Sequence, residues 1–425
     1  MRILGCIADD ITGATDVASA IARAGSATAL FFGVPAEDEP IPHGCEAVVI
    51  ALKSRTSPSA EAVEDSLAAQ TWLMRQGFPT LYFKYCSTFD STPEGNIGPV
   101  SEALMERAGS PLVIHAPGYP ENGRTVYQGH LFVGSVPLSE SSMRDHPLTP
   151  MTDSNLQRVL AAQSRAPVRV LPIGVIAQGA EAISDGLSTA RAGDAGHVIA
   201  DTIAPDDLVA LADATVDQPL LAGGAAFAGA VTRSRRHRDV SPHPLGAGDS
   251  SATPAAVLAG SASTATAAQI DDFAERWPAL RLEMDALMRQ DVVADILAWA
   301  EERLPHGPVL IAPRSDQESV QRAHDRYGRD VAAARIEEVL AEVARTLVAS
   351  GLRRLIVAGG ETSGAVAAAL GLTSVLVGED IARGVPWVYA PERDLALAFK
   401  SGNFGGPRFF REALGEPAGD GAGDA

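Results

Sequence analysis

The sequence predicts an α/β protein of two domains, each built on a mostly parallel sheet flanked by helices. Apolar runs of strand length alternate with amphipathic helical stretches in both halves of the chain, which is the pattern of βαβ units. A stretch rich in Pro, Gly and Ser interrupts this alternation at 233–254. The 425 residues are enough for about two or three domains with buried cores.

In the first half, apolar runs predict strands at 2–8, 27–33, 47–52, 80–85 and 112–116. The amphipathic stretches between them predict helices at about 12–25, 58–76 and 97–108. Ligands of parallel sheets bind at the carboxyl ends of the strands. The residues that follow each strand are therefore the first candidates for a site.

Residues 117–152 break this rhythm with Pro, Gly, His and polar side chains, and we expect a functional segment there. Further strands are predicted at 168–173, 197–201, 219–222, 255–260, 309–312 and 355–358, with helices from about 263 and through about 350. We expect domains at 1–235 and 255–413, an exposed linker at 236–254 and a disordered tail at 414–425.

Composition excludes several classes of protein. The formal net charge of −19 argues against a nucleic-acid partner, because such a field repels polyanions. Cys6, Cys45 and Cys86 are too few and too far apart for a disulfide framework or a zinc site. No uncharged apolar run approaches the roughly 20 residues that span a bilayer. We expect a cytoplasmic protein with no membrane partner, and a homodimer is one option that the sequence leaves open.

Lysine is rare in this chain. Only Lys53, Lys84 and Lys400 occur among 34 basic residues, so the other 31 are arginines. Each lysine then indicates a place where a compact ammonium group is needed, although chance is the plain alternative. The chain contains no HExxH, no GxxxxGK[ST] and no GxGxxG, which argues against zinc hydrolases, P-loop proteins and dinucleotide-binding proteins.

Polar side chains follow the first strand directly. Asp9, Asp10 and Thr12 stand where that strand turns into the first helix. Two adjacent carboxylates at such a place can hold a substrate hydroxyl, accept its proton or bind Mg²⁺. The alternative is simple helix capping by Asp10 or Thr12.

Two more strand ends carry cations and hydroxyls. Lys53, Ser54 and Arg55 suit a carboxylate or phosphate, since arginine can donate to two oxygens at once, although a surface cluster is the alternative. The third strand end adds a dense polar set: Lys84, Ser87, Thr88, Asp90, Ser91 and Asn96. If the three strands are neighbours, their ends line one crevice for a small, hydroxylated anion. The irregular segment adds further donors, or a lid, through Asn122, Arg124 and His130.

The second half carries Gly-rich turns that open helices. One turn contains Ser261 and Ser263, another runs through Gly359, Gly360, Glu361 and Thr362, and a third contains Lys400, Gly402 and Asn403. Such turns present free amides to phosphates at a positive helix end. Together they predict a nucleotide site, although each alone is compatible with an ordinary tight turn.

Five segments resemble the four-carbon acid sugar kinases: ADDITGATD, KYCSTFDSTPEGNIGPV, APGYPENGRTVYQGHLFVG, GGETSG and KSGNFGG. They occur in the same order and span nearly the whole chain apart from the tail. The TFDSTPEGNIGPV form resembles the kinases that act on 3-oxo-tetronate, whereas D-threonate and D-erythronate kinases usually carry a shorter, DSTLRG-like form.

The resemblance implies an acid-sugar domain followed by an ATP domain, with the active site in the cleft between them. ATP contacts are implied at Ser261 or Ser263, at 359–362 and at Gly402. The expected reaction transfers the γ-phosphoryl group of ATP, with Mg²⁺, to the C4 hydroxyl of the sugar acid. Asp10 is the expected proton acceptor, with Asp9 and Asp90 as rivals, while Arg55 and Lys84 would hold the substrate carboxylate.

Three alternatives remain open. A D-threonate or D-erythronate kinase is the nearest, because one oxidation level at C3 separates the substrates. An NAD-dependent acid-sugar dehydrogenase should show GxGxxG after an early strand, where this chain has DDITGATD. A non-catalytic acid-sugar sensor would not need the second set of Gly-rich turns.

Overall fold

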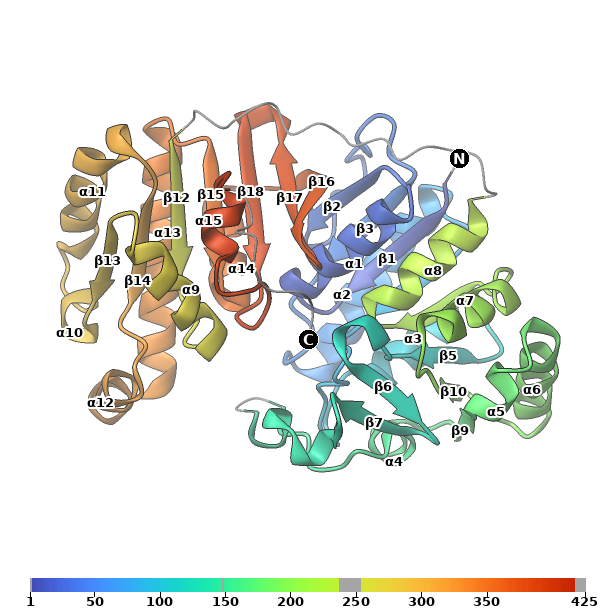
Figure 1. Cartoon of the computed structure of the whole chain (residues 1–425). Helices are drawn as coiled ribbons and strands as arrows, with labels where there is room; N and C mark the ends of the chain where they lie inside the picture. The colour runs from blue at the N-terminus through green and yellow to red at the C-terminus, as the bar shows by residue number, and fades with distance from the viewer. Residues whose placement is uncertain (1, 147–148, 237–253, 417–425) are drawn as a thin grey trace. The chain divides into compact units, whose positions relative to one another are not determined.

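The computed structural model describes residues 2–146, 149–236 and 254–416, and the chain divides into two compact units, 1–243 and 244–425. Figure 1 shows an α/β arrangement in each unit, with helices packed on both faces of a sheet. The linker expected at 236–254 lies, apart from its two end residues, outside the described residues.

The sheet of the first unit is parallel throughout, in the order β2-β3-β1-β4-β11-β5-β10-β9. Its strands are β1 (Leu4–Ala8), β2 (Thr28–Phe32), β3 (Ala47–Ala51), β4 (Leu81–Lys84), β5 (Val113–Ala116), β9 (Val168–Leu171), β10 (His197–Ala200) and β11 (Leu220–Gly223). Its helices are α1 (Ile11–Arg23), α2 (Ser59–Arg75), α3 (Ile97–Ala108), α4 (Leu156–Ala161), α5 (Ile173–Ile176), α6 (Ala180–Ala192), α7 (Pro205–Ala214) and α8 (Ala225–Arg235).

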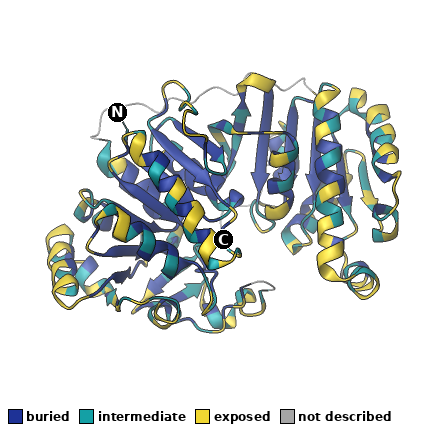
Figure 2. Cartoon of the chain, turned by 180° about the vertical axis from the view of Figure 1, so that it is seen from behind, coloured by how far each residue is buried: buried dark blue, intermediate teal, exposed yellow. Residues whose placement is uncertain are grey.

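The predicted alternation of strands and helices is confirmed in this unit. Strands that are buried on both faces read as continuous apolar runs, and all five residues of β1 are buried. Figure 2 shows the strands in dark blue and the outward faces of the helices in yellow. The order puts β1 between β3 and β4, and Ala8 pairs with both Ala51 and Lys84. The three strand ends that carry the predicted site are therefore neighbours.

Residues 117–152 contain a small antiparallel sheet that the sequence analysis did not predict. Its strands are β6 (Arg124–Tyr127), β7 (His130–Val133) and β8 (Val136–Pro137), accompanied by the 3-10 turns η1 (Pro120–Asn122), η2 (Leu138–Glu140) and η3 (Ser142–Asp145). Gly129 and Gly134 close its turns with positive φ angles of 71° and 59°. Strands of two to four residues are too short to show a clear period-two pattern, so the sequence predicted an irregular segment here.

The sheet of the second unit has the order β13-β14-β12-β15-β18-β17-β16. It is parallel from β13 to β18, and β17 is antiparallel to both of its neighbours. The strands are β12 (Ala255–Ala259), β13 (Ala279–Leu282), β14 (Val309–Pro313), β15 (Arg354–Ala358), β16 (Ser374–Ala382), β17 (Val385–Ala390) and β18 (Leu395–Lys400).

The helices of the second unit are α9 (Thr264–Ala274), α10 (Met284–Leu287), α11 (Val292–Arg303), α12 (Gln317–Tyr327), α13 (Arg329–Ala349), α14 (Gly360–Ala369) and α15 (Phe409–Ala413), with the 3-10 turns η4 (Leu304–His306) and η5 (Pro391–Arg393). The predicted long helix is α13. It begins after Gly328, whose φ of 81° ends α12. Strands β13, β16, β17 and β18 were not predicted.

The core of the second unit gathers around the aromatic side chains of Phe273, Phe409 and Phe410. Of the tail expected at 414–425, residues 417–425 lie outside the described residues, while Leu414 packs against this core and Glu416 accepts a hydrogen bond from Arg411. None of the helices in the described part of the chain has the length and apolar character needed to cross a bilayer.

Candidate functional site

The carboxyl end of β1 carries a pair of acidic side chains with different surroundings. Asp10 caps α1: its Oδ1 accepts from the Gly13 amide at 3.0 Å and its Oδ2 from the Thr12 hydroxyl at 2.8 Å. Asp10 therefore caps the helix, but its carboxylate remains accessible. The Asp10 side chain is 24% exposed, compared with 6% for the Asp9 side chain. Asp10 is the acid that a ligand can reach.

Arg55 joins the two carboxylates. Its Nε and Nη2 donate to the two oxygens of Asp9 at 2.8 and 2.7 Å, and Nη2 also donates to Asp10 Oδ1 at 2.6 Å. Burial alone would raise the pKa of Asp10, but Arg55 and the nearby Lys84 outweigh it and lower that pKa. Asp10 is thus held as an anion, and Arg55 retains the two hydrogens of Nη1 for a ligand.

Lys84 ends β4 beneath the same group of side chains. It is 2% exposed, and its Nζ donates to the Tyr85 carbonyl at 2.8 Å. A Cβ on Gly13 would lie 2.2 Å from Asp10 Oδ1 and 3.1 Å from Lys84 Nζ. The absence of a side chain at Gly13 therefore lets the ammonium group and the Asp10 carboxylate approach each other over the start of α1.

The connection after β4 supplies the other predicted side chains. Thr88 donates to Asp90 Oδ1 at 2.5 Å, and both residues are buried, while Ser87 is half-buried. Phe89 between them has a positive φ of 56°, so the chain turns sharply there. Asp90 is buried whereas Asp10 is half-buried, so Asp90 is the weaker candidate for accepting a substrate proton.

The loop after β3 is held in place by Asn96, a member of the polar set predicted at the end of the third strand. Asn96 is buried, and its Nδ2 donates to the carbonyls of Ser54 and Ser57 at 2.7 and 2.8 Å. Ser54 is buried and Lys53 is exposed. The segment that presents Arg55 is therefore tied to the start of α3, whereas the Lys53 side chain lies in solvent.

The irregular segment is anchored to the main sheet of its unit. Val126 exchanges backbone hydrogen bonds with Thr202, and the buried carboxylate of Asp201 accepts from the amides of Gln128 and Gly129. Asn122 lies in η1, Arg124 begins β6 and donates to the Asn122 carbonyl, and His130 begins β7. Among the described residues, none of these three forms a hydrogen bond or ion pair with Asp9, Asp10 or Arg55, so their predicted role as substrate donors stays a prediction.

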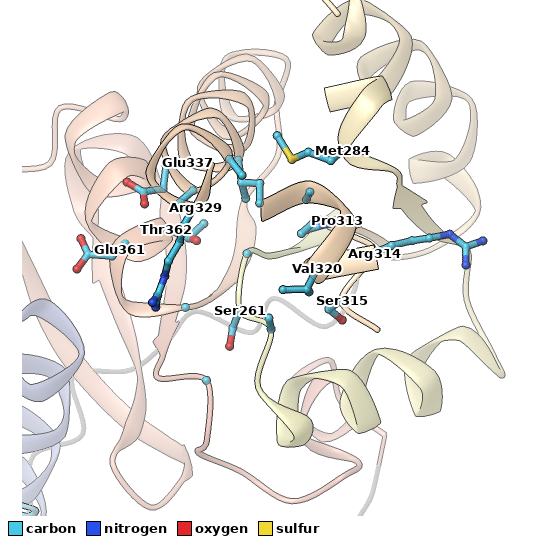
Figure 3. Close-up of a pocket in the computed structure, with 18 of the residues that line it drawn as sticks. Ser261, Met284, Pro313, Arg314, Ser315, Val320, Arg329, Glu337, Glu361 and Thr362 are labelled. Carbon is cyan, nitrogen blue, oxygen red and sulfur yellow. The ribbon is translucent and has the colours of Figure 1, made fainter. Parts of the chain in front are cut away.

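The second unit contains a pocket of about 500 Å³ (Figure 3). Its polar wall comes from the Gly-rich turns that follow β12, β15 and β18: Ser261, Gly359, Gly360, Glu361, Thr362 and Gly402. Its apolar wall comes from α10, β14, α12 and α13: Met284, Pro313, Val320, Ala332, Ala333 and Ile336. A pocket that is apolar on one side and lined by turn amides on the other suits a flat aromatic base joined to phosphates.

The three turns meet because their strands are adjacent in the sheet. Ala358 pairs with both Ala259 and Lys400, so the turns leave the same edge. Ser263 caps α9 and its hydroxyl donates to the Gly402 carbonyl at 2.6 Å. The first-turn amides of α14, from Gly360 onward, belong to the positive end of a ten-residue helix.

Three of the residues predicted for this site do not line the pocket. Ser263 lies behind the turn as a helix cap, and Asn403 is exposed. Lys400 is fully buried, and its Nζ donates to Thr266 and to the carbonyls of Ser401 and Gly402. Its ammonium group is directed to the protein interior.

Sequence reasoning missed Arg329 and the apolar wall. Arg329 begins α13 and lines the pocket, and Figure 3 labels it among the residues of the wall. In a chain with 31 arginines, one more at a helix start carries no signal. The apolar wall comes from an Ala- and Arg-rich stretch of generic composition, in which only the three-dimensional structure marks Ala332, Ala333 and Ile336.

No group of three or more metal-ligating side chains occurs in the described residues. Glu361 is an exposed carboxylate in the pocket wall. Magnesium is usually held by one or two carboxylates together with substrate phosphates, so this donor set fits Mg²⁺ that arrives with a nucleotide.

Comparison with known proteins agrees with a sugar-type site in the first unit and a nucleotide-type pocket in the second. A family model for a sugar-binding N-terminal domain matches residues 4–231, and one for a nucleotide-binding C-terminal domain matches residues 256–410. Two domains of these kinds define a sugar kinase. The chain belongs to the four-carbon acid sugar kinase family.

Individual relatives match over nearly the full length. A Pseudomonas fluorescens protein named 3-oxo-tetronate kinase is 48% identical, covering 98% of this chain and 97% of its own. A Methylobacterium radiotolerans protein of the same name is 46% identical, covering 97% and 98%. The crystal structure of a Salmonella typhimurium LT2 protein matches with a TM-score of 0.87 and 38% identity, covering 96% of this chain and 98% of its own.

Proposed function

We propose that this protein is a 3-oxo-tetronate kinase, which transfers the γ-phosphoryl group of ATP to the C4 hydroxyl of that acid. The observation that carries the proposal is the full-length match to curated relatives of that name at 46–48% identity. The site agrees with it, since a cluster of acids and cations in the first unit suits a small sugar acid. Residues 1–235 would bind the acid sugar and residues 255–413 would bind ATP.

Asp10 is the proposed proton acceptor. It is the more exposed of the adjacent pair, and its lowered pKa keeps it ionised. As the C4 oxygen attacks the γ-phosphorus, the new O–P bond forms, the bond to the leaving ADP breaks, and the hydroxyl proton passes to Asp10. Asp9, with both oxygens held by Arg55, acts in this scheme by orienting the guanidinium group.

The substrate carboxylate would be held by Arg55 and Lys84. Arg55 keeps the two hydrogens of Nη1 while Nε and Nη2 are bound to the acids. Lys84 uses one of its three hydrogens for the Tyr85 carbonyl. Ser54 and Ser87 belong to the same strand ends and are proposed donors to the hydroxyl and keto oxygens. Thr12 and Thr88 give their hydroxyl hydrogens to Asp10 and Asp90, so they are proposed as acceptors from substrate hydroxyls.

The nucleotide would occupy the pocket of the second unit. The first-turn amides of α14, from Gly360 onward, and the Ser261 hydroxyl would contact the phosphates, and the apolar wall would cover the base. Mg²⁺ bound to ATP would neutralise phosphate charge, with Glu361 as the protein carboxylate available to it. Arg329 adds a positive charge to the same wall.

A D-threonate or D-erythronate kinase is the second candidate, because such an enzyme would need the same acids, cations and nucleotide pocket. The test is ADP release in the presence of Mg-ATP with 3-oxo-tetronate, D-threonate, D-erythronate, a neutral tetrose or no sugar. Turnover confined to the oxo acid supports the proposal. Turnover of a tetronate instead keeps the kinase and changes its substrate, and ADP release with none of them overturns the kinase function.

We also propose that the enzyme works in the cytoplasm, where ATP is available. The free thiols of Cys6, Cys45 and Cys86 are compatible with a reducing compartment. The homodimer stays a prediction, and light scattering coupled to size-exclusion chromatography would test it.

A further inference from the structure

Lys400 is buried beneath the turn that follows β18. Its side chain is 0% exposed, and its Nζ donates to Thr266 Oγ1 at 3.1 Å, the Ser401 carbonyl at 2.9 Å and the Gly402 carbonyl at 3.0 Å. These three acceptors match the three hydrogens of an ammonium group. In the described part of the chain, no carboxylate forms an ion pair with it. A buried cation without a counter-charge is costly and calls for an explanation.

The turn above Lys400 has two consecutive carbonyls facing inward. Gly402 O accepts from Lys400, from the Ser263 hydroxyl at 2.6 Å and from the Thr266 hydroxyl at 2.8 Å. In a planar trans peptide the carbonyl and the following N–H point in opposite directions. Because the carbonyls of Ser401 and Gly402 point at Lys400, the amides of Gly402 and Asn403 point away from it.

Those two amides have no acceptor among the described residues. Consecutive N–H groups with a common direction form a concave anion-binding nest. Gly402 also lines the pocket, whereas Ser263, Thr266 and Lys400 do not. A Cβ on Gly402 would lie 2.3 Å from Ser261 Oγ, so the turn backbone is held directly against another pocket residue.

Lys400 also connects this turn to the neighbouring one. Its own carbonyl accepts from the Gly359 amide at 2.8 Å, and Gly359 immediately precedes α14. The same residue therefore fixes the turn after β18 through its side chain and the turn after β15 through its backbone. Both turns contribute to the polar wall of the pocket.

We propose that Lys400 is a positioning residue for phosphate binding: it turns the Gly402 and Asn403 amides toward the nucleotide without touching the nucleotide itself. This inference rests on the proposed use of ATP. It replaces the expectation that the Lys400 ammonium group is itself a phosphate ligand.

The protonation of Lys400 provides a second readout. Burial lowers its pKa to about 7. The groups that face Nζ are uncharged: the Thr266 hydroxyl on α9, two carbonyls of its own turn, and the rings of Phe409 and Phe410, each 5.9 Å away. An anion bound at the nest favours the charged amine, so nucleotide binding at about pH 8 should be accompanied by proton uptake.

The experiment compares wild type with Lys400→Met, which keeps the chain length and removes all three donors. We expect the Kd for ADP, measured by calorimetry, and the KM for ATP to rise about tenfold or more, with the KM for the acid sugar unchanged. Calorimetry at about pH 8 in buffers of different ionisation enthalpy should detect proton uptake for wild type and its loss in the variant. ADP is fully ionised there and does not contribute.

Arg354→Met is the matched control, because Arg354 is a buried cation of the same unit that lies outside the pocket lining and donates to the Ala413 carbonyl. It should lower thermal stability while the Kd for ADP remains that of wild type. If Lys400→Met does not fold, Thr266→Val tests the same inference, because it removes one donor to the Gly402 carbonyl. This variant should weaken ADP binding by a few fold.

A folded Lys400→Met protein with wild-type affinity for ADP and unchanged proton uptake would overturn the inference. A wild-type protein that binds ADP but phosphorylates none of the acids would overturn the proposed function instead. The ADP affinities of the variants would still decide the role of Lys400.

Discussion

Arg55 and Asp9 form a bidentate pair at the carboxyl edge of the first sheet, with N–O distances of 2.8 and 2.7 Å. The two residues are 46 positions apart in the chain and meet because β3 and β1 are adjacent. The same guanidinium group reaches Asp10, so a single arginine organises both acids of the proposed substrate site.

Asp9→Asn should destabilise the protein, because it removes one of the two carboxylates that balance the charge of a largely buried guanidinium group. We expect a loss of about 2–3 kcal/mol in the free energy of unfolding, measured with urea. Arg75→Ala is the control, since Arg75 and Glu37 form an exposed pair, and it should change that free energy by at most about 0.5 kcal/mol. Equal effects of the two substitutions would argue against the pair as an organising element.

Asp10→Asn should separate the two roles of this residue. Asparagine caps helices as well as aspartate does, so the stability of α1 should be retained. Loss of the proton acceptor should lower kcat by about 10²- to 10⁴-fold, while the Kd for ADP stays unchanged. Steady-state kinetics with the accepted sugar acid would check this, and a variant with near-normal kcat would exclude Asp10 as the base.

The lowered pKa of Asp10 predicts how protein stability and kcat should depend on pH. Its folded-state pKa lies below the ordinary value of 3.8, so its contribution to stability is complete above about pH 4 and is lost as the pH falls through the folded value. No acidic limb of kcat should therefore arise from Asp10 between about pH 5 and 8. If such a limb is present in wild type and disappears in Asp10→Asn, this assignment is wrong.

Gly402→Ala should damage nucleotide binding because of the close approach to Ser261 Oγ. We expect the KM for ATP to rise about tenfold or more as the turn shifts to accept the methyl group. Gly406→Ala, four residues along the same segment, is the control, because a Cβ there meets nothing within 4 Å. If both variants have the KM of wild type, Gly402 does not form part of the ATP site.

Arg329→Ala should raise the KM for ATP by about tenfold through the loss of a positive charge from the pocket wall. The effect should shrink at high ionic strength, because salt screens an exposed charge. Arg326→Ala, on the exposed side of α12 and paired with Asp285, should leave the KM for ATP unchanged. A normal KM in Arg329→Ala at low salt would remove this residue from the site.

A buried pair of histidines should make the first unit sensitive to acid. His115 Nε2 lies 3.0 Å from His197 Nδ1, and burial lowers the pKa of both side chains. The unfolded chain then binds more protons than the folded one below about pH 6.5, so stability should fall as the pH drops from there. His115→Gln should reduce this slope, which is at most about 1.4 kcal/mol per pH unit for each histidine, in urea unfolding at several pH values.

Much of the proposed substrate site could be predicted from the sequence because its residues follow strand ends. Asp9, Asp10 and Lys84 each stand within two residues of the end of a strand, and parallel pairing brings such ends together. The partners within the site could not be predicted in this way. That Arg55 takes both acids, and that Asn96 holds the Arg55 loop, depends on side-chain geometry across different strands and helices.

By itself the sequence determined the alternation of strands and helices, the two-domain division and the family, because hydrophobic periodicity, turn chemistry and motifs are local properties of the chain. Only the tertiary structure decided where the side chains of Lys400 and Arg329 lie. Lys400 is buried against Thr266, 134 residues earlier, while Arg329 lines a pocket. The local sequence around a lysine near a Gly-rich turn is the same whether its side chain faces the ligand or the protein interior. Only long-range packing distinguishes these two orientations.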